Sequence, residues 1–131
     1  MSSLEQQVIQ FNTTYNVESS SIPRLPTEDE ANRIYHLINE ELQETNEELD
    51  AMDLSKLAKE LTDILYVTAQ QMAVLGLPID ALLREVQRSN MSKLGEDGKP
   101  IYRDDGKVLK GSNYIPANIE KVLKEASNEH L

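Results

Sequence analysis

Two pairs of acidic residues with the same spacing are the feature of this sequence most suited to chemistry. Glu41 and Glu44 lie three residues apart, and so do Glu60 and Asp63. In a helix, this spacing places both carboxylates of a pair on one face, about one turn apart. Each pair can therefore bind a shared ligand if its segment is helical.

Both acidic pairs fall in segments whose apolar residues recur at helical spacing. Thr27 and Glu30 form a capping box, which predicts a long helix from there to about Leu49. Asp53 is a suitable N-cap for a second long helix, which Gly76 ends. Each pair is therefore expected on a long helix of its own.

The short link between these helices brings the two pairs together. Only residues 50–52 separate the helices, so the helices are expected to lie antiparallel as neighbours. Glu44 and Glu60 lie at nearly the same distance along the chain from the middle of this link, with a difference of about one residue. The same holds for Glu41 and Asp63. Because a helix rises about 1.5 Å per residue, the two members of each cross-helix pair are expected to be level to within a few ångströms. Four carboxylates are expected to converge between the helices.

Such a convergence of carboxylates requires a cation, because like charges at close range raise one another's pKa values. Asp63 adds to the case, since it is the only charged residue between Leu61 and Leu77 and an isolated carboxylate is costly to bury. Oxygen ligands without His or Cys favour Mg²⁺, with Mn²⁺ as a substitute. By contrast, Glu47 and Glu48 are expected on the outer face of their helix.

A metal centre of this kind is suited to phosphates, whose oxygens it bridges while it activates a water for in-line attack. Glu40 is next to Glu41 and four residues before Glu44, so it is predicted to face the same cleft and to orient or deprotonate that water. A phosphorylated substrate also needs cations from the protein. The candidates in the basic part of the chain are Arg88, Lys93, Lys107 and Lys110.

The charge balance limits the classes of partner. The formal charge of −10 on 131 residues disfavours nucleic-acid binding, which requires a cationic surface. The charge is uneven, because residues 28–63 hold twelve acidic and three basic residues, whereas residues 84–110 hold five acidic and seven basic ones. The sequence has no cysteine, no membrane-length apolar run and no signal-peptide pattern, so a cytoplasmic protein without membrane contact is expected.

The fold is expected to be an antiparallel bundle of four to five helices, with its helical core in residues 1–94 and a last short helix in the tail. Residues 3–15 form an amphipathic helix, and the serines and prolines of residues 17–26 predict a loop. A further helix is expected over residues 78–94, with proline in its first turn. The fold class is therefore all-α, within one domain over residues 1–131.

The tail, residues 95–131, is turn-rich, and as far as Lys110 it continues the basic stretch that starts at residue 84. Its second Asp-Gly pair, Asp105-Gly106, can close a small hairpin between residues 101–103 and 107–109. Pro116 is expected to start a last short helix.

The order Glu-x-x-Glu, fifteen residues, Glu-x-x-Asp resembles the signature of the all-α nucleoside triphosphate pyrophosphatases. This MazG-like group includes dimeric dUTPases and phosphoribosyl-ATP pyrophosphohydrolase. The agreement extends to Asp63-Ile64-Leu65-Tyr66-Val67, to Asn90-Met91-Ser92-Lys93 and to the tail segment Asp105-Gly106-Lys107-Val108-Leu109-Lys110-Gly111. The resemblance covers residues from about 27 to 119.

The resemblance implies Mg²⁺-dependent hydrolysis of a nucleoside triphosphate to the monophosphate and pyrophosphate, with water attacking the α-phosphorus. It also implies a homodimer or a homotetramer built as a dimer of dimers, and a deoxynucleotide substrate in the control of nucleotide pools. The implied site residues are Glu41, Glu44, Glu60 and Asp63 as metal ligands, Glu40 as the base, and Asn90 with Lys93 as phosphate or sugar contacts.

Two other classes of protein account less well for this sequence. A carboxylate-bridged di-iron bundle requires two Glu-x-x-His motifs, and neither His36 nor His130 follows a glutamate at that spacing. An acidic helical interaction module without catalysis would explain the charge, but it would explain neither the level acid pairs nor the basic tail. A metal titration separates this module from the enzyme, because an interaction module should not gain several degrees of thermal stability from millimolar Mg²⁺.

Overall fold

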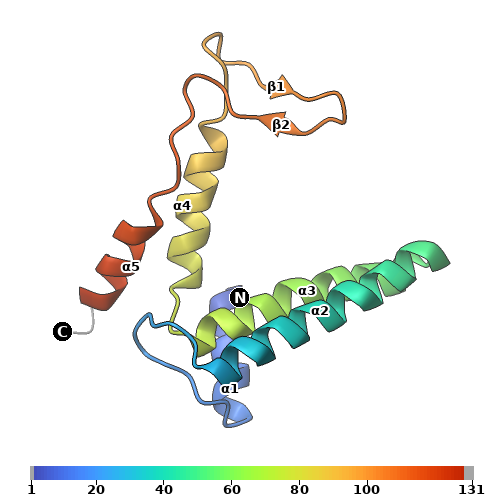
Figure 1. Cartoon of the computed structure of the whole chain (residues 1–131), viewed down its shortest axis with the longest axis vertical. Coiled ribbons are helices and arrows are strands. Elements are labelled where there is room, and N and C mark those ends of the chain that lie inside the picture. The colour runs from blue at the N-terminus through green and yellow to red at the C-terminus, as the bar shows by residue number, and fades with distance from the viewer. Residues whose placement is uncertain (1, 129–131) are drawn as a thin grey trace.

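The computed structural model describes residues 2–128 and confirms the predicted all-α fold class (Figure 1). His130 lies outside the described residues. Within them, the elements in chain order are α1 (Leu4–Thr14), α2 (Glu28–Ala51), α3 (Leu54–Val74), α4 (Ile79–Met91), β1 (Ile101–Tyr102), β2 (Val108–Leu109) and α5 (Ile119–Asn128).

The long helices α2 and α3 pack side by side as the predicted antiparallel pair (Figure 1). The predicted capping box at Thr27 and the predicted N-cap at Asp53 are both present. α2 continues to Ala51 rather than ending at Leu49, and Met52 makes the turn with a left-handed φ of 57°. The link is thus even shorter than predicted, which holds the two helices at a fixed register.

The buried core lies where α1, α3 and α4 meet, at the base of the molecule in Figure 1. Val8 of α1 is fully buried against Ala69 and Ala73 of α3 and Ile79 of α4. α1 makes its contacts with α3 and α4, so it braces the end of α3 that lies away from the α2–α3 turn.

The predicted loop over residues 17–26 is fastened to the end of α3. The backbone N–H groups of Ser20 and Arg24 donate to the carbonyls of the last residue of α3 and of its C-cap, at 2.9 and 3.0 Å. Gly76 follows with a φ of +69°, and a Cβ atom there would lie 2.3 Å from the carbonyl oxygen of Ile22. Only glycine lets the chain turn from α3 to α4 beneath this loop.

α4 leaves α3 at an angle of 118° and forms an arm together with the hairpin and α5 (Figure 1). α4 ends at Met91 and not at the predicted Leu94, because the Ser92 hydroxyl binds the tail by accepting from the N–H of Ile115 at 2.9 Å. No single described helix is long and apolar enough to cross a membrane; α3 and α4 satisfy that criterion only when combined across their bend.

The tail forms the predicted hairpin, with Ile101 opposite Leu109 in an antiparallel pair. The last helix starts at Ile119 rather than at Pro116. The difference has a local cause, because Asn118 caps the helix through its Oδ1 atom, which accepts from a backbone N–H of the first turn at 3.1 Å.

We expect Gly76→Ala to lower the free energy of unfolding by more than Gly98→Ala does. Both glycines have a positive φ, so alanine incurs a left-handed backbone cost of about 1–2 kcal/mol at each position. Only at Gly76 does the new Cβ also meet backbone atoms, since nothing lies within 4 Å of a Cβ at Gly98. Urea unfolding of both variants measures the difference, and equal losses would show that the loop does not restrain the α3–α4 turn.

Candidate metal centre

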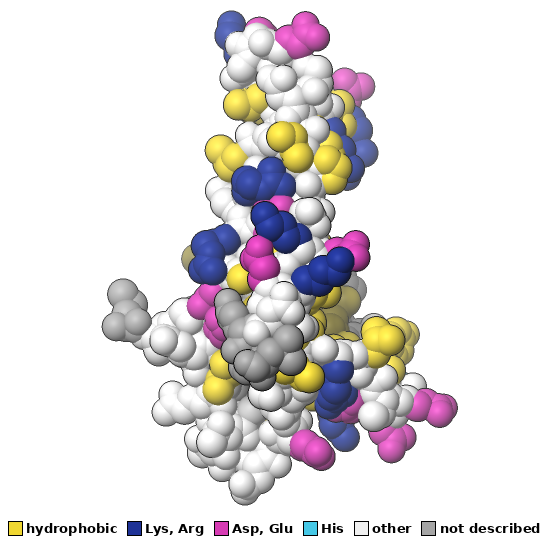
Figure 2. Space-filling model, turned by 90° about the vertical axis from the view of Figure 1, so that its left-hand side faces the viewer, with side chains coloured by type: hydrophobic (Ala, Val, Ile, Leu, Met, Phe, Trp, Pro, Cys, Tyr) yellow, Lys and Arg dark blue, Asp and Glu magenta, His cyan; other side chains and the backbone are white. Residues whose placement is uncertain are grey.

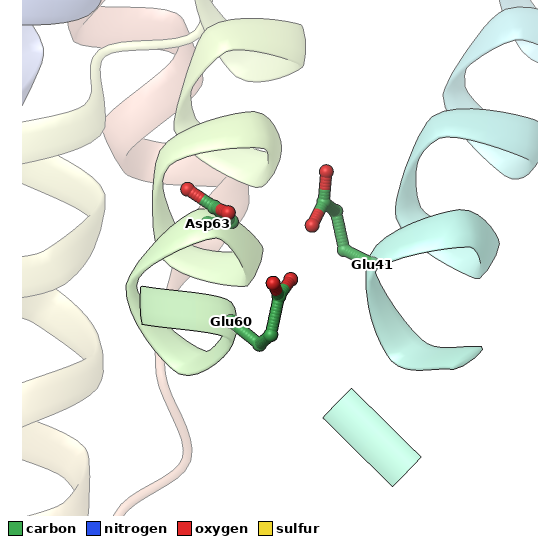
Figure 3. Close-up of side chains that lie close together, drawn as sticks. All are labelled: Glu41, Glu60 and Asp63. Atoms are coloured by element: carbon green, nitrogen blue, oxygen red, sulfur yellow. The ribbon is translucent and has the colours of Figure 1, made fainter. Parts of the chain in front are cut away.

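Glu41 of α2 faces Glu60 and Asp63 of α3 across the space between the helices (Figure 3). One carboxylate oxygen from each residue lies within 4.8 Å of the other two, and all three residues are partly buried. Ligands on opposite sides of one Mg²⁺ ion are about 4 Å apart, because each bond is about 2.1 Å long. Small side-chain adjustments would therefore close this cluster around a single ion.

Two oxygen atoms of the cluster are buried without a partner. Within the described chain, neither Oε2 of Glu41 nor Oε2 of Glu60 has a hydrogen-bond donor. A buried carboxylate oxygen without a donor is costly, so such atoms indicate a ligand. The donor set is made of hard oxygens, and it therefore fits a divalent cation such as Mg²⁺ or Mn²⁺.

The electrostatics of the cluster also favour a cation. Burial raises the pKa of the Glu41 carboxyl, and the charge of Glu44 and those of the acids on α3 raise it further. Burial and contact with Glu44 raise the pKa of Glu60, whereas the charge of Lys59 opposes this rise. Glu44 raises both pKa values although it is itself exposed. A bound cation would stabilise the ionised forms of all these groups.

Asp63 has a partner that the sequence analysis missed. Nζ of Lys59 lies 2.7 Å from Oδ2 of Asp63, one turn away on α3. Opposite charges at positions i and i+4 were the signal for this pair. The Lys59 side chain is 70% exposed, so solvent screens the pair and a divalent cation can compete for Asp63.

The neighbouring acids of α2 divide into two groups. Glu40 and Glu47 are exposed, as was expected for Glu47. The expectation that Glu48 lies on the outer face is wrong, because Glu48 is half-buried and its Oε2 atom is buried without a partner in the described chain. Seven residues after Glu41, two helical turns bring Glu48 back to the same face.

The predicted substrate contacts all lie on the arm. Figure 2 shows Lys and Arg side chains gathered along it, and within the described chain α4 makes no contact with α2. Asn90 and Lys107 are exposed, and Lys93 is half-buried just beyond α4. Nζ of Lys110 lies 4.8 Å from the centre of the Tyr114 ring. The structure therefore separates the predicted cations from the acids of the same chain.

Arg88 differs from the other predicted cations because it has an internal role. Its guanidinium forms an ion pair with Glu85 at 2.6 Å and donates to the carbonyl of Pro116 at 3.1 Å. Arg88, together with a hydrogen bond from the Asn118 N–H to Glu85, lowers the pKa of Glu85 to about 2. Arg88 and Glu85 thus fasten the start of α5 to α4.

Carboxylates that face each other between antiparallel helices, with oxygens free to bind a cation, suit chemistry on phosphates. Residues 8–90, more than half of the chain, match the family described as phosphoribosyl-ATP pyrophosphohydrolase. The chain belongs to this family, which lies within the all-α nucleoside triphosphate pyrophosphatase superfamily, and whose members are typically metal-dependent. No curated protein sequence matches the chain.

We expect the metal-free protein to lose stability as the pH rises above about 4.5, the ordinary pKa of a glutamate here. The pKa values of Glu41 and Glu60 are raised in the folded chain, so the folded chain binds protons more tightly than the unfolded one and is destabilised as they ionise. Glu30 and Glu85, with pKa values of about 2, have the opposite effect, but only below this pH range. Melting temperatures measured with EDTA across this pH range test the sign.

Mg²⁺ should restore the stability lost at the higher pH, and Glu41→Gln should weaken both the pH dependence and the response to Mg²⁺. Glu47→Gln is the matched control, because it removes an exposed charge from the same helix. A melting temperature that does not respond to Mg²⁺ in the unaltered protein would favour an interaction module without a metal.

Proposed function

We propose that this protein is a Mg²⁺-dependent pyrophosphohydrolase that converts a nucleoside triphosphate and water to the monophosphate and pyrophosphate. The observation that carries the proposal is that Glu41 faces Glu60 and Asp63 and that two oxygens of this cluster are buried without a hydrogen-bond donor in the described chain. The chain also belongs to the pyrophosphohydrolase family. A deoxynucleotide substrate and a role in controlling nucleotide pools follow from the resemblance alone.

In this proposal, Glu41, Glu60 and Asp63 hold the cation and Glu44 completes its exposed side. A divalent cation held there would supply positive charge for the phosphates and would lower the pKa of a water molecule. We assign Glu40, which is exposed beside Glu41, the acceptance of the proton from that water. The water oxygen bonds to the α-phosphorus, and the bond to the bridging oxygen breaks. Pyrophosphate leaves with the electron pair.

The proposal includes a homodimer or a dimer of dimers. α2 and α3 carry leucines that are each at least 50% exposed and that recur at helical spacing, namely Leu42, Leu49, Leu54, Leu61 and Leu65. On α4, the exposed apolar residues are Leu83, Val86 and Met91. Contiguous apolar faces of this kind are usually covered by another chain.

The separation of charges supports the same assembly. Asn90 and Lys93 lie on the arm, which does not touch α2 in the described chain. An acidic centre that acts on phosphates needs such donors. We therefore infer that the arm of one chain serves the acids of another.

Release of pyrophosphate tests the activity, with a panel of dNTPs, NTPs and phosphoribosyl-ATP in the presence of Mg²⁺. In ¹⁸O-labelled water, the heavy oxygen should enter the monophosphate and not the pyrophosphate, because attack occurs at the α-phosphorus. Asp63→Asn and Glu41→Gln should abolish turnover while the helical circular dichroism is kept. Orthophosphate as the first product, or near-normal turnover by either variant, would contradict the proposal.

Glu40→Gln separates the base from the metal ligands. It should lower kcat by ~10²-fold or more while Mg²⁺ affinity stays within a small factor. A Glu40→Gln protein that no longer binds Mg²⁺ would make Glu40 a ligand instead.

Mixed oligomers test whether two chains build one site. We expect Asp63→Asn to be inactive and Lys93→Ala to be impaired roughly tenfold or more, as for loss of a charge-assisted hydrogen bond. Refolding the two variants together should recover activity, because some mixed oligomers pair intact acids with an intact arm. Asp63→Asn refolded with Glu41→Gln is the control, since every site then lacks an acid. A mixture of Asp63→Asn and Lys93→Ala that is no more active than its share of Lys93→Ala alone would show that each site lies within one chain.

A further inference from the structure

A pocket with a volume of about 520 Å³ lies at the turn between α3 and α4, where α1 and the loop over residues 17–26 also line it. Ala73, in its wall, comes ten residues after Asp63 on α3, so the pocket is about 15 Å along the helix axis from the acidic cluster. Its size is that of a site for a small organic molecule. Most of its walls are apolar, through Ile9, Val17, Ala73, Leu77, Ile79 and Ala126.

The side chain of Asn12 lines this pocket and has one atom without a partner. Asn12 is only 2% exposed, and its Nδ2 atom donates to Oγ of Ser19 at 3.2 Å and to the carbonyl of Gln70 at 3.4 Å. Because a carbonyl can only accept, the contact with Gln70 fixes which end of the amide is nitrogen. Oδ1 is then buried without a donor in the described chain. A buried acceptor of this kind is costly, so it indicates a ligand that donates.

The other polar side chains of the pocket restrict the ligand further. The hydroxyl of Ser19 donates to the carbonyl of Val17 at 3.2 Å, and that of Ser20 donates to the carbonyl of Ile22 at 2.6 Å. Each hydroxyl has one hydrogen, so neither serine has a donor left for a ligand. The pocket therefore accepts at Asn12 and offers no donor from these two serines.

The charge around the pocket disfavours an anion. Glu5 lines the pocket, where its Oε1 atom accepts from the N–H of Ile79 at 3.0 Å. The negative charge of Asp80 also acts on Glu5. Two acidic side chains repel a phosphate, and apolar walls make a charge of either sign costly to bury. The ligand that fits is uncharged, with an apolar ring and an N–H donor.

An exocyclic amino group supplies that donor better than a ring N–H does. The amino group of adenine or cytosine projects beyond its ring, so it can reach a single buried oxygen while the ring contacts the apolar walls. The N3–H of uracil or thymine lies between two carbonyl groups. These carbonyl oxygens would need donors of their own, which Ser19 and Ser20 do not have.

We propose that this pocket is a binding site for an uncharged heterocycle with an exocyclic amino group, which donates to Oδ1 of Asn12. Neither the acidic cluster nor the basic residues of the arm belong to it. Gly76 and Pro78 line the pocket, so the bound ring would contact the turn that joins the arm to α3. A free nucleoside and the base of a bound nucleotide offer the same chemistry, and the experiment distinguishes these two sources.

Calorimetric titration with matched nucleosides tests the site without any hydrolysis. Adenosine is compared with purine riboside, and cytidine with pyrimidin-2-one riboside, because the members of each pair differ only by the amino group. We expect the amino member to bind at least roughly tenfold more tightly in each pair, and uridine to bind as weakly as the analogues that lack the group. Equal affinities within both pairs, or uridine binding as tightly as cytidine, would overturn the proposal.

Asn12→Leu locates the contact, and Gln10→Leu is its matched control, since it removes an exposed amide from the same helix. Asn12→Leu should abolish the difference in affinity within each pair, whereas Gln10→Leu should keep it. Weaker binding by Asn12→Leu with an unchanged ratio within each pair would give Asn12 a structural role only and would overturn the contact. If Asn12→Leu does not fold, as judged by circular dichroism, the paired titrations of the unaltered protein still decide the proposal.

The source of the ring is decided by the release of pyrophosphate from a triphosphate in the presence of the tighter-binding nucleoside. A nucleoside that raises KM and leaves kcat unchanged takes the place of the substrate's own base. A nucleoside that changes kcat at saturating triphosphate binds a separate site and acts on the enzyme through it. If no triphosphate is hydrolysed but the paired titrations differ as expected, the site stands and the proposed function does not.

Discussion

The packing of α2 on α3 brings Glu41 within 4.8 Å of Glu60 and Asp63, so charge repulsion opposes the contact that builds the site. Several features of the protein reduce this repulsion. The raised pKa values of Glu41 and Glu60 reflect this repulsion and favour the uncharged forms, and the ammonium group of Lys59 pairs with Asp63. Neither provides donors for the two buried carboxylate oxygens. A divalent cation would reduce the repulsion and would also bind these two oxygens. The site is therefore better suited to binding an ion than to stabilising the metal-free fold.

The positive charges that could neutralise these acids are kept elsewhere in the chain. Lys93 and Lys110 lie on the arm, and within the described residues α4 does not touch α2. If the two groups met within one chain, they would form ion pairs and leave little for a ligand. Their separation leaves each group with unsatisfied charge, which a substrate carrying both a metal ion and phosphates can neutralise at once.

Local signals predicted the elements that hold the acids, because caps and short links act through neighbouring residues. The capping box at Thr27 and the N-cap at Asp53 are of this kind, and together with the short link they predicted the facing acids. The predictions that were wrong concern the end of α4, which depends on tertiary contacts, and the face of α2 on which Glu48 lies. α4 ends early because its last turn is bound by a segment more than twenty residues away, and Glu48 was assigned to the outer face although its spacing from Glu41 indicated otherwise. The contact between Ser89 and the tail has no local signal at all.

The turn at Gly76 sets the angle between α3 and α4, and small changes there are amplified along α4. α4 has 13 residues and is therefore about 20 Å long, so a rotation of about 10° at this turn would move its far end by about 3 Å. A displacement of that size is as long as a hydrogen bond and would remove any contact made at the tip. The carbonyl of Ile22 packs against Gly76, so it helps to fix the position of side chains at the far end of α4.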